Sequence, residues 1–537
     1  MDEASTPAPD EVPFLSVDQV LEQGAPLCLG GIRFGRFQWG VTSVMGLIWI
    51  CGALQTMNMV FYLSARPSSP TSSEFPQTIE EEWDMKPGSS GFVGSCFFFG
   101  WLLGNWGFGA LSDTRGRKFT LYVTTFVSAS AGLLSAAAPN LFVFTVLRAI
   151  CGAGSGGMGL SSWVLVAEYW PPSARVVGGC LFHGWFSIGI FIVALIAYLL
   201  SDPSMGGWRA LIVATSLPSL LPLLALKLSP ESARWLHTQG RKNHATEALR
   251  RATQTNRCPL AFHLRGGSGP GDTGGEMDVV QYGIVDLFSM AKLRLITLIL
   301  MFAWFTVSFS YYGISLHAGN VRNVGADDGE EPLSEIELES PGGPFANKAL
   351  NTLLAGVVEI PAFILSIPLL AYGGRRLGCL LFLGALALAC LGFGMMPQAS
   401  VFFIMVGKLA SAGAFAAIYL FSTELFPTVL RNLGIGLCSL SARIGGIAAP
   451  LVVAMGHDWL ALPMICFGLS SLGAAFLIMW LPETLGRPLA DTLEDVATKS
   501  DEYGELEEEG IELDEAHLQE QEECVFDSNR QEEEEDL

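Results

Sequence analysis

Long apolar runs recur along the whole chain, and polar residues are concentrated in the segments between them. Each run has about 20 residues, enough for a helix to cross the roughly 30 Å hydrocarbon layer of a bilayer. Twelve such runs lie near residues 37–63, 89–112, 119–138, 141–166, 177–200, 208–228, 293–316, 347–372, 377–397, 401–423, 433–456 and 459–481. The pattern predicts an all-α membrane protein with twelve transmembrane helices.

The polar segments between the runs repeat. Glu168-x-x-Pro171-x-x-x-Arg175 returns 256 residues later as Glu424-x-x-Pro427-x-x-x-Arg431. The string Pro-Glu-Ser at 230–232 returns 252 residues later as Pro-Glu-Thr, and GALSDTRGRK at 109–118 has a partial echo in LLAYGGRR at 369–376. A repeat of this kind predicts two parallel six-helix bundles with a substrate site between them, near the middle of the membrane.

Basic residues fall in alternate loops, and this alternation sets the orientation. They are Arg115, Arg117, Lys118, Arg175, Arg234, Arg241, Lys242, Arg250, Arg251, Lys292, Arg294, Arg375, Arg376 and Arg431. The opposite loops are short, or acidic like 326–339. The positive-inside rule therefore places both termini in the cytosol, which agrees with an even number of spans.

Five segments follow from these observations. Residues 1–36 are expected to form a cytosolic N-terminus that carries no cleavable signal peptide. Bundles at 37–228 and 293–482 flank a cytosolic linker loop, 229–292, whose first part favours an amphipathic helix and whose GGSGPGDTGG string at 266–275 is typical of flexible linkers. Residues 483–537 form a cytosolic, largely disordered acidic tail.

Composition supports a membrane protein, and most of the net negative charge is concentrated in one segment. The 537 residues are 50% hydrophobic and 15% charged, with a formal charge of −22. Residues 501–537 hold 18 acidic side chains against Arg530, so the tail accounts for −17 and the other 500 residues for −5. The acidity thus indicates a solvated tail, with docking of a cytosolic partner as the alternative, and it does not indicate a nucleic-acid or metal partner.

Several strings in this chain resemble the organic cation, organic anion and carnitine transporter family of the major facilitator superfamily. They are RAICGAGSGGMGLSSWVLVAEYWPPSAR (148–175), PESARWL (230–236), WFTVSFSYYGIS (304–315), VVEIPA (357–362), ELFPTVLRNLGIG (424–436), SARIGGIAAP (441–450) and LPETLGRPLADTLEDV (481–496). The resemblance runs from about residue 17 to 497. It implies a secondary or facilitative carrier that moves small organic ions by alternating access, not an enzyme, with a monomeric state and a plasma or organelle membrane.

The chain departs from many animal members of this family. The loop after the first span, residues 64–88, is short and has neither cysteine nor a glycosylation sequon, so it is similar to short-loop, synaptic-vesicle-type relatives. Ala371 stands where the first repeat has Asp113, which predicts an asymmetric ionic lock. Phe363 replaces a lysine of some anion carriers.

Ionisable groups inside membrane spans are costly and mark functional or paired positions. Four stand out in the predicted spans: Arg148, Glu359, Lys408 and Arg443. Arg148 and Glu359 each have a structural alternative, ion pairing or helix packing. The resemblance matches Lys408 and Arg443 to basic residues of anion-handling members, so Arg443 is our candidate for setting substrate charge, with a purely structural pair to Glu359 as the alternative. The three charges of Glu359, Lys408 and Arg443 sum to +1, which favours organic anions or zwitterions.

Uncharged residues complete the predicted substrate site. The polar members are Gln55 and Asn58 in the first span, and the aromatic members are Trp304, Tyr311 and Tyr312, with Phe305 beside them. Aromatic faces suit a flat or amphiphilic solute, although several of them must pack helices instead. His183 is a membrane histidine whose simplest role is a structural hydrogen bond.

Charged residues at the cytosolic ends of the spans are candidate gates. They are Asp113, Arg117, Glu168, Arg175, Glu424 and Arg431. We expect their ion pairs to hold the outward-facing state and to break as the bundles rock.

Other readings remain at this point. A sugar or nutrient porter of a sister family and a transporter-like solute receptor are alternatives to the organic ion carrier. Gly152-Ala-Gly154-Ser-Gly-Gly157 fits a dinucleotide-binding pattern, but it lies inside a span, where small residues allow close helix packing. No ATP-binding loop, metal cluster or catalytic triad is visible, so we expect neither a cofactor nor a nucleic-acid partner.

Overall fold

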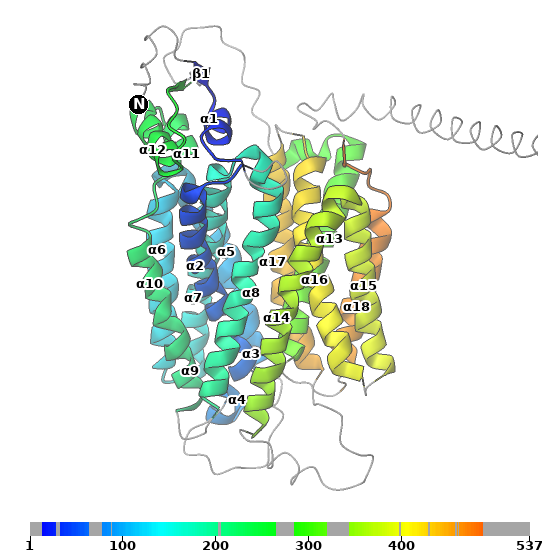
Figure 1. The fold of residues 1–537 in the computed structure, drawn as a ribbon. Coiled ribbons are helices and arrows are strands. Elements are labelled where there is room, and N and C mark those ends of the chain that lie inside the picture. Colours follow the sequence, from blue (N-terminus) through cyan, green and yellow to red (C-terminus); the bar gives the residue numbers. More distant parts are fainter. Residues whose placement is uncertain are drawn as a thin grey trace, which may run out of the picture.

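The computed structural model describes residues 13–27, 33–63, 78–86, 89–201, 206–264, 284–318, 343–396, 399–427, 430–456, 459 and 461–486. Two groups of long helices stand side by side, one from each half of the chain (Figure 1). The predicted flexible linker at 266–275, the acidic loop at 326–339 and the acidic tail at 501–537 lie outside the described residues.

The amino-terminal group contains the helices up to residue 225. The long ones are α2 (Arg36–Met57), α5 (Gly91–Arg115), α6 (Arg117–Ala136), α7 (Leu141–Tyr169) and α8 (Arg175–Leu199). Shorter pieces are α3 (Met59–Tyr62), α4 (Ile79–Glu82), η3 (Pro172–Ala174), α9 (Gly207–Ser216), η5 (Pro218–Leu220) and α10 (Leu221–Ala225). The predicted span 208–228 is interrupted because Pro218 and Pro222 each remove a backbone donor.

The carboxy-terminal group contains six long helices. They are α13 (Ala291–Ala318), preceded by η6 (Ile284–Phe288), α14 (Gly343–Tyr372), α15 (Arg375–Met395), α16 (Ser400–Leu425), α17 (Arg431–Met455) and α18 (Leu462–Ile478). Pro361 and Pro368 lie inside α14 and Pro450 inside α17, and the helices continue through them.

Ten helices in the described part of the chain are long and apolar enough to cross a membrane. Large apolar side chains cover the outer surface of the helices in both groups, including Trp106, Phe142 and Leu388, as a lipid-facing surface requires. Two of the twelve predicted spans are not among the ten: α5, which is 25 residues long and rich in glycine, and α18, which is a shorter apolar helix of 17 residues. The count of twelve stays a prediction.

A small cap of secondary structure covers one end of the amino-terminal half (Figure 1). It consists of β1 (Phe14–Leu15), α1 (Val17–Gln23), α11 (Ala233–Thr238), α12 (Lys242–Thr255) and β2 (His263–Leu264). The helix predicted in the first part of the linker loop is therefore present as α12, which buries one apolar face, including Ala245 and Leu249. We call this end of the molecule the α12 end, and the opposite end, where α4 lies, the α4 end.

Asn256 fastens the cap to the bundle. Its amide nitrogen donates to the Gly24 carbonyl (2.9 Å) and to Gln38 Oε1 (3.0 Å), and its amide oxygen accepts from the Phe37 backbone nitrogen (2.9 Å). A Cβ at Gly35 would lie 2.1 Å from that amide oxygen, so the contact requires glycine there.

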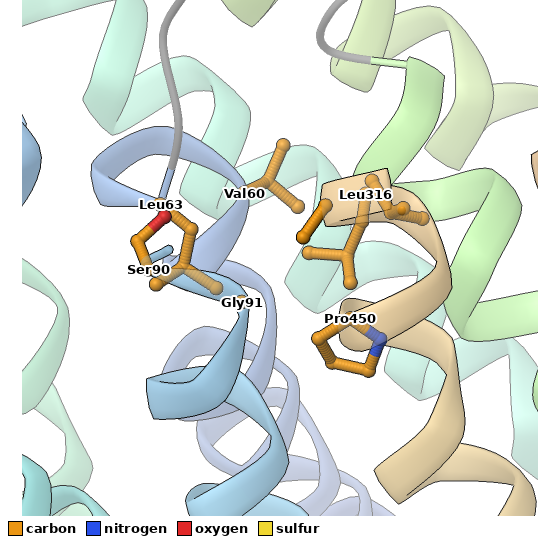
Figure 2. A pocket seen from close by; sticks show the side chains of 8 residues that line it. Val60, Leu63, Ser90, Gly91, Leu316 and Pro450 are labelled. Atoms are coloured by element: carbon orange, nitrogen blue, oxygen red, sulfur yellow. The ribbon is translucent and has the colours of Figure 1, made fainter. Parts of the chain in front are cut away.

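The two halves touch along α8 with α14 and along α5 with α17. At the α4 end the contact is tight, because a Cβ at Gly91 would lie 2.7 Å from the Pro450 carbonyl oxygen. Ser95 Oγ donates to the Ile447 carbonyl across the same seam at 2.7 Å. Figure 2 shows the apolar pocket of about 30 Å³ that remains between Val60 and Leu63 of one half and Leu316 of the other. The halves are thus closed against each other at the α4 end.

Candidate functional site

A cavity of about 110 Å³ lies between the two halves. The amino-terminal half contributes α2, α5, α7 and α8 to its wall, and the carboxy-terminal half contributes α13, α14, α16 and α17. The lining residues are Ile48, Trp49, Gly52, Trp101, Asn105, Ser155, Gly159, Leu160, Trp163, His183, Phe186, Tyr311, Tyr312, Phe363, Ala412, Phe415, Tyr419, Ser439 and Arg443. The wall is therefore mostly aromatic, with a few polar groups.

Arg443 is the cation in this wall. It lies in the middle of α17, and its guanidinium carbon is 4.8 Å from the centroid of the Trp101 ring on the other half. Tyr312 also interacts with the guanidinium. No carboxylate of the described residues lies within 4.0 Å of Arg443, so its charge faces aromatic rings, an amide and the cavity.

Glu359 pairs with Lys408 and not with Arg443. The Lys408 Nζ lies 2.6 Å from Glu359 Oε1, and both side chains have no exposed surface. Lys408 also donates to Ser315 Oγ (2.5 Å) and lies 3.4 Å above the Tyr311 ring centroid, while Ser187 Oγ donates to Glu359 from the other half. The structural pair that the sequence left open for Arg443 is therefore formed by Lys408, and neither Glu359 nor Lys408 lines the cavity.

The predicted aromatic residues divide between cavity and packing. Tyr311 and Tyr312 line the cavity. Trp304 lies outside the lining, where its indole nitrogen donates to Ser422 Oγ (2.8 Å) and its ring packs on Tyr419 at 4.3 Å. Phe305 stacks on Phe309 in the same helix.

His183 lies in the cavity wall within a cluster of rings. Its Nδ1 is 2.9 Å from the Gly179 carbonyl, the structural hydrogen bond that the sequence favoured. Trp163 and Tyr419, from different halves, both contact this histidine, and their ring centroids lie 5.5 Å apart, so aromatic rings of the two halves meet in the cavity wall.

Gln55 and Asn58 do not reach the cavity wall. Both are buried in the amino-terminal half with Arg148, which donates to the Gln55 carbonyl (2.5 Å) and to Asn58 Oδ1 (3.1 Å). Arg148 also lies over the rings of Tyr62 and Phe97. Its partners are neutral acceptors and aromatic faces, whereas the sequence analysis gave an ion pair with an acidic residue as an alternative.

The charged residues at the α12 end form pairs within each half. In the amino-terminal half Arg117 lies 3.1 Å from Asp113 and 3.3 Å from Glu168. In the other half Arg375 lies 3.0 Å from Glu424. Because Ala371 replaces the first acid, the second half has one pair where the first has two, as the asymmetric lock predicts.

The remaining two candidate gate residues have other surroundings. Arg175 pairs with Asp18 of α1, which also pairs with Arg234 of α11. Arg431 begins α17 and is partly exposed. The ion pairs that Arg117, Arg175, Arg234 and Arg375 form each join segments of the same half, and the gating role of these residues stays a prediction.

The repeated Pro-Glu strings have a clear structural role. Glu231 accepts hydrogen bonds from the backbone nitrogens of Arg117 (3.0 Å) and Lys118 (3.2 Å), and Glu483 accepts from those of Arg375 (2.8 Å) and Arg376 (3.0 Å). Each carboxylate thus caps the first turn of a helix, where unpaired N–H groups favour negative charge. Burial raises the pKa of Glu483, but four backbone N–H donors outweigh it and hold the pKa below its usual range.

Several functional candidates were missed from the sequence. Trp49, Trp101, Asn105, Trp163 and Tyr419 all line the cavity. Their positions in apolar spans gave a weak signal, because aromatic residues are common in such spans, although a polar Asn105 in an apolar run was visible. Among the described residues, no group of three His, Cys, Asp or Glu side chains is placed to hold a metal ion.

Every sequence comparison matches this chain to membrane transporters. The sequence model of the "Sugar (and other) transporter" family matches residues 44–316. An "Organic cation transporter protein" of Drosophila melanogaster is 34% identical over 439 residues, which are 79% of this chain and 74% of the relative. "Solute carrier family 22 member 7" of Bos taurus is 35% identical over 448 residues (81% and 76%), and "Solute carrier family 22 member 15-like" of Xenopus laevis is 32% identical over 491 residues (86% and 94%).

Structure comparison gives the fold. The partially occluded inward-open xylose transporter XylE from E. coli superposes with a TM-score of 0.61 at 16% identity, covering 84% of this chain and all of that one. At this identity the likeness shows the fold alone. The chain is therefore a multi-pass integral membrane protein of the major facilitator superfamily and belongs to its organic cation, anion and carnitine transporter family.

Proposed function

We propose that this chain is a secondary or facilitative carrier of small organic ions that works by alternating access and prefers organic anions or zwitterions. The observation that carries the preference is Arg443, which places an uncompensated guanidinium in the central cavity. A desolvated guanidinium binds a carboxylate or sulfonate through two parallel hydrogen bonds. The relatives' names support organic ions as the substrate class.

The aromatic wall of the cavity suits the rest of such a solute. Trp49, Trp163 and Tyr419 offer flat apolar faces, and such faces also attract a cationic group when the solute is a zwitterion. The tight packing of the two halves at the α4 end supports alternating access, because it closes one end of the cavity while the ion pairs of Arg117 and Arg375 at the α12 end lie within their own halves.

The orientation belongs to the same proposal. We place the α12 end, with both termini, in the cytosol and count twelve spans, α5 and α18 included. In that orientation the closed α4 end faces the outside of the cell or the organelle lumen. The positive-inside distribution of arginine and lysine supports this placement.

Uptake by purified protein in liposomes tests the charge preference. Matched anionic, zwitterionic and cationic probes are compared for the natural chain and for Arg443→Ala, Arg443→Lys and Arg443→Asp. We expect Arg443→Ala to abolish anion uptake, Arg443→Lys to recover little because the forked geometry is lost, and Arg443→Asp to shift residual uptake toward cations. Cation preference of the natural chain, or anion uptake that survives Arg443→Ala, refutes the proposal.

The same liposomes separate the carrier from the two alternatives. A solute receptor would bind the probes without counterflow, and a sugar porter would accept neutral sugars in preference to charged solutes. Arg443 in the cavity wall favours the ion carrier over the sugar porter, because burying a guanidinium without an anionic partner is costly.

A further inference from the structure

We propose that Asn105 is a positioning residue that sets the direction in which Arg443 presents its guanidinium, and that it thereby favours solutes with a carboxylate that binds end-on to the two terminal amino groups. This inference rests on the proposed function of Arg443. It assigns to an uncharged residue of the opposite half a part in selecting the solute.

The geometry begins with the Asn105 amide. With its nitrogen donating to the Gly156 carbonyl at 2.9 Å, its oxygen accepts from Arg443 Nε at 3.2 Å. This orientation is the one that satisfies both ends of the amide, since the reverse places oxygen against an acceptor and nitrogen against a donor. Asn105 therefore holds Arg443 by the nitrogen nearest its side-chain stem.

Gly156 makes this arrangement possible. A Cβ at position 156 would lie 2.5 Å from the Trp101 carbonyl oxygen, 2.7 Å from Trp101 Cδ1 and 2.9 Å from the Asn105 amide atom that faces Gly156. Any side chain there would push α5 away from α7 and move the amide. The glycine-rich string that mimics a dinucleotide motif thus allows α5 to approach α7 closely enough for Asn105 to bond its backbone.

Trp101 fixes the plane of the same guanidinium. The indole lies 4.8 Å from the guanidinium carbon and covers one face of it. A guanidinium can receive a carboxylate side-on, through Nε and one terminal nitrogen, or end-on, through both terminal nitrogens. Since Asn105 occupies Nε, the end-on mode is the one left for a solute.

The contact also crosses the halves. Asn105 and Trp101 belong to α5 of the amino-terminal half, and Arg443 belongs to α17 of the other. The guanidinium is therefore oriented by the opposite half in the packing seen here. A preoriented donor loses less conformational entropy when the solute binds, so we expect Asn105 to act on apparent affinity more than on the maximal rate.

The test compares Asn105→Ala, Asn105→Asp and a matched control, Trp106→Leu, whose side chain follows Asn105 on the same helix but is 83% exposed on the outer surface. Liposome uptake gives KM and maximal rate for an aromatic monocarboxylate, its uncharged amide and its trimethylammonium analogue. We expect Asn105→Ala to raise KM for the carboxylate about five- to tenfold, the size of effect typical of losing one ordinary hydrogen bond, and to change the maximal rate by less than about twofold.

The uncharged amide, the ammonium analogue and the Asn105→Asp variant test the same inference. KM for the amide and the ammonium analogue stays unchanged in Asn105→Ala, and Asn105→Asp, which puts a carboxylate on Arg443, loses carboxylate uptake and gains uptake of the ammonium probe. Equal changes for all three probes, or no change for the carboxylate, overturn the inference. If Arg443→Ala abolishes carboxylate uptake while Asn105→Ala leaves it intact, this inference alone fails; if Arg443→Ala leaves it intact, the proposed function fails first.

Discussion

Removing one partner of the buried Glu359–Lys408 pair should destabilise the protein more than removing both. In Lys408→Met the carboxylate loses the ammonium 2.6 Å away and keeps the Ser187 hydroxyl as a partner, at a site with no exposed surface. Stranding one charge of a buried pair typically costs about 3–5 kcal/mol, whereas replacing both charges by uncharged groups of similar volume is often neutral or stabilising. The double variant Glu359→Gln/Lys408→Met should therefore recover most of the loss.

The assay is thermal unfolding of the purified protein in detergent, with the natural chain, both single variants and the double variant measured under one condition. We expect a clear drop in apparent melting temperature for Lys408→Met and a return toward the natural value in the double variant. Because neither residue lines the cavity, the double variant should also keep the natural chain's preference among charged probes. A double variant as unstable as the sum of the single variants would refute the coupling, and a changed charge preference would return Lys408 to the substrate site.

Three further predictions concern the α12 end and the tail. Asp113→Asn should lower uptake severalfold while solute-induced thermal stabilisation stays largely intact, because Arg117 keeps Glu168 at 3.3 Å; an unaltered initial rate at matched expression counts against a gating role. A chain ending near residue 497 should keep specific uptake in liposomes, because the acidic tail has too few apolar residues to form a packed core. Loss of uptake by the folded shorter chain would show that the tail takes part in transport. Glu483 has a lowered pKa, so its contribution to stability is present above its ordinary pKa of 4.5 and is lost as the pH falls through the lower pKa of the folded state. The difference in melting temperature between the natural chain and Glu483→Gln should therefore stay constant from pH 7 to about pH 5 and shrink only in stronger acid. A difference that disappears above pH 5 contradicts the capping argument.

Much of the fold could be predicted from hydrophobicity alone. The predicted spans 119–138 and 401–423 correspond to α6 (Arg117–Ala136) and α16 (Ser400–Leu425), within a few residues at each end. Lipid imposes this agreement, because every backbone polar group in the hydrocarbon must be satisfied within its own helix. Proline changes the helix locally but does not end the span: 208–228 is divided into α9, η5 and α10 around Pro218 and Pro222, yet Gly207–Ala225 is long and apolar enough to cross a membrane.

Partners of the charged residues were harder to predict than their positions. The sequence places Glu359, Lys408 and Arg443 within membrane spans, but it does not show which of the two cations forms an ion pair with Glu359. The pairing follows from which helices are neighbours. Glu359 lies on α14, which packs against α16 with Lys408, whereas Arg443 lies on α17, which packs against α13 and α5. Contacts of Arg443 with Trp101 and Asn105 depend on how the two halves pack against each other. The pattern of hydrophobic residues within a single helix carries no information about that packing.

A comparison of Arg148, Lys408 and Arg443 shows why Arg443 is the one suited to bind a solute. Arg148 and Lys408 have no exposed surface, and the protein supplies their partners: a carbonyl, an amide and two rings for Arg148, and a carboxylate and a hydroxyl for Lys408. A solute anion would have to displace those partners, and the displaced group would then be left unpaired in a low-dielectric interior. Arg443 is partly exposed to the cavity, and its partners in the protein are the Asn105 amide oxygen on one nitrogen, Tyr312, and the Trp101 ring on one face. An incoming carboxylate there replaces water, not a protein carboxylate, so its binding adds the missing counter-charge without stranding another.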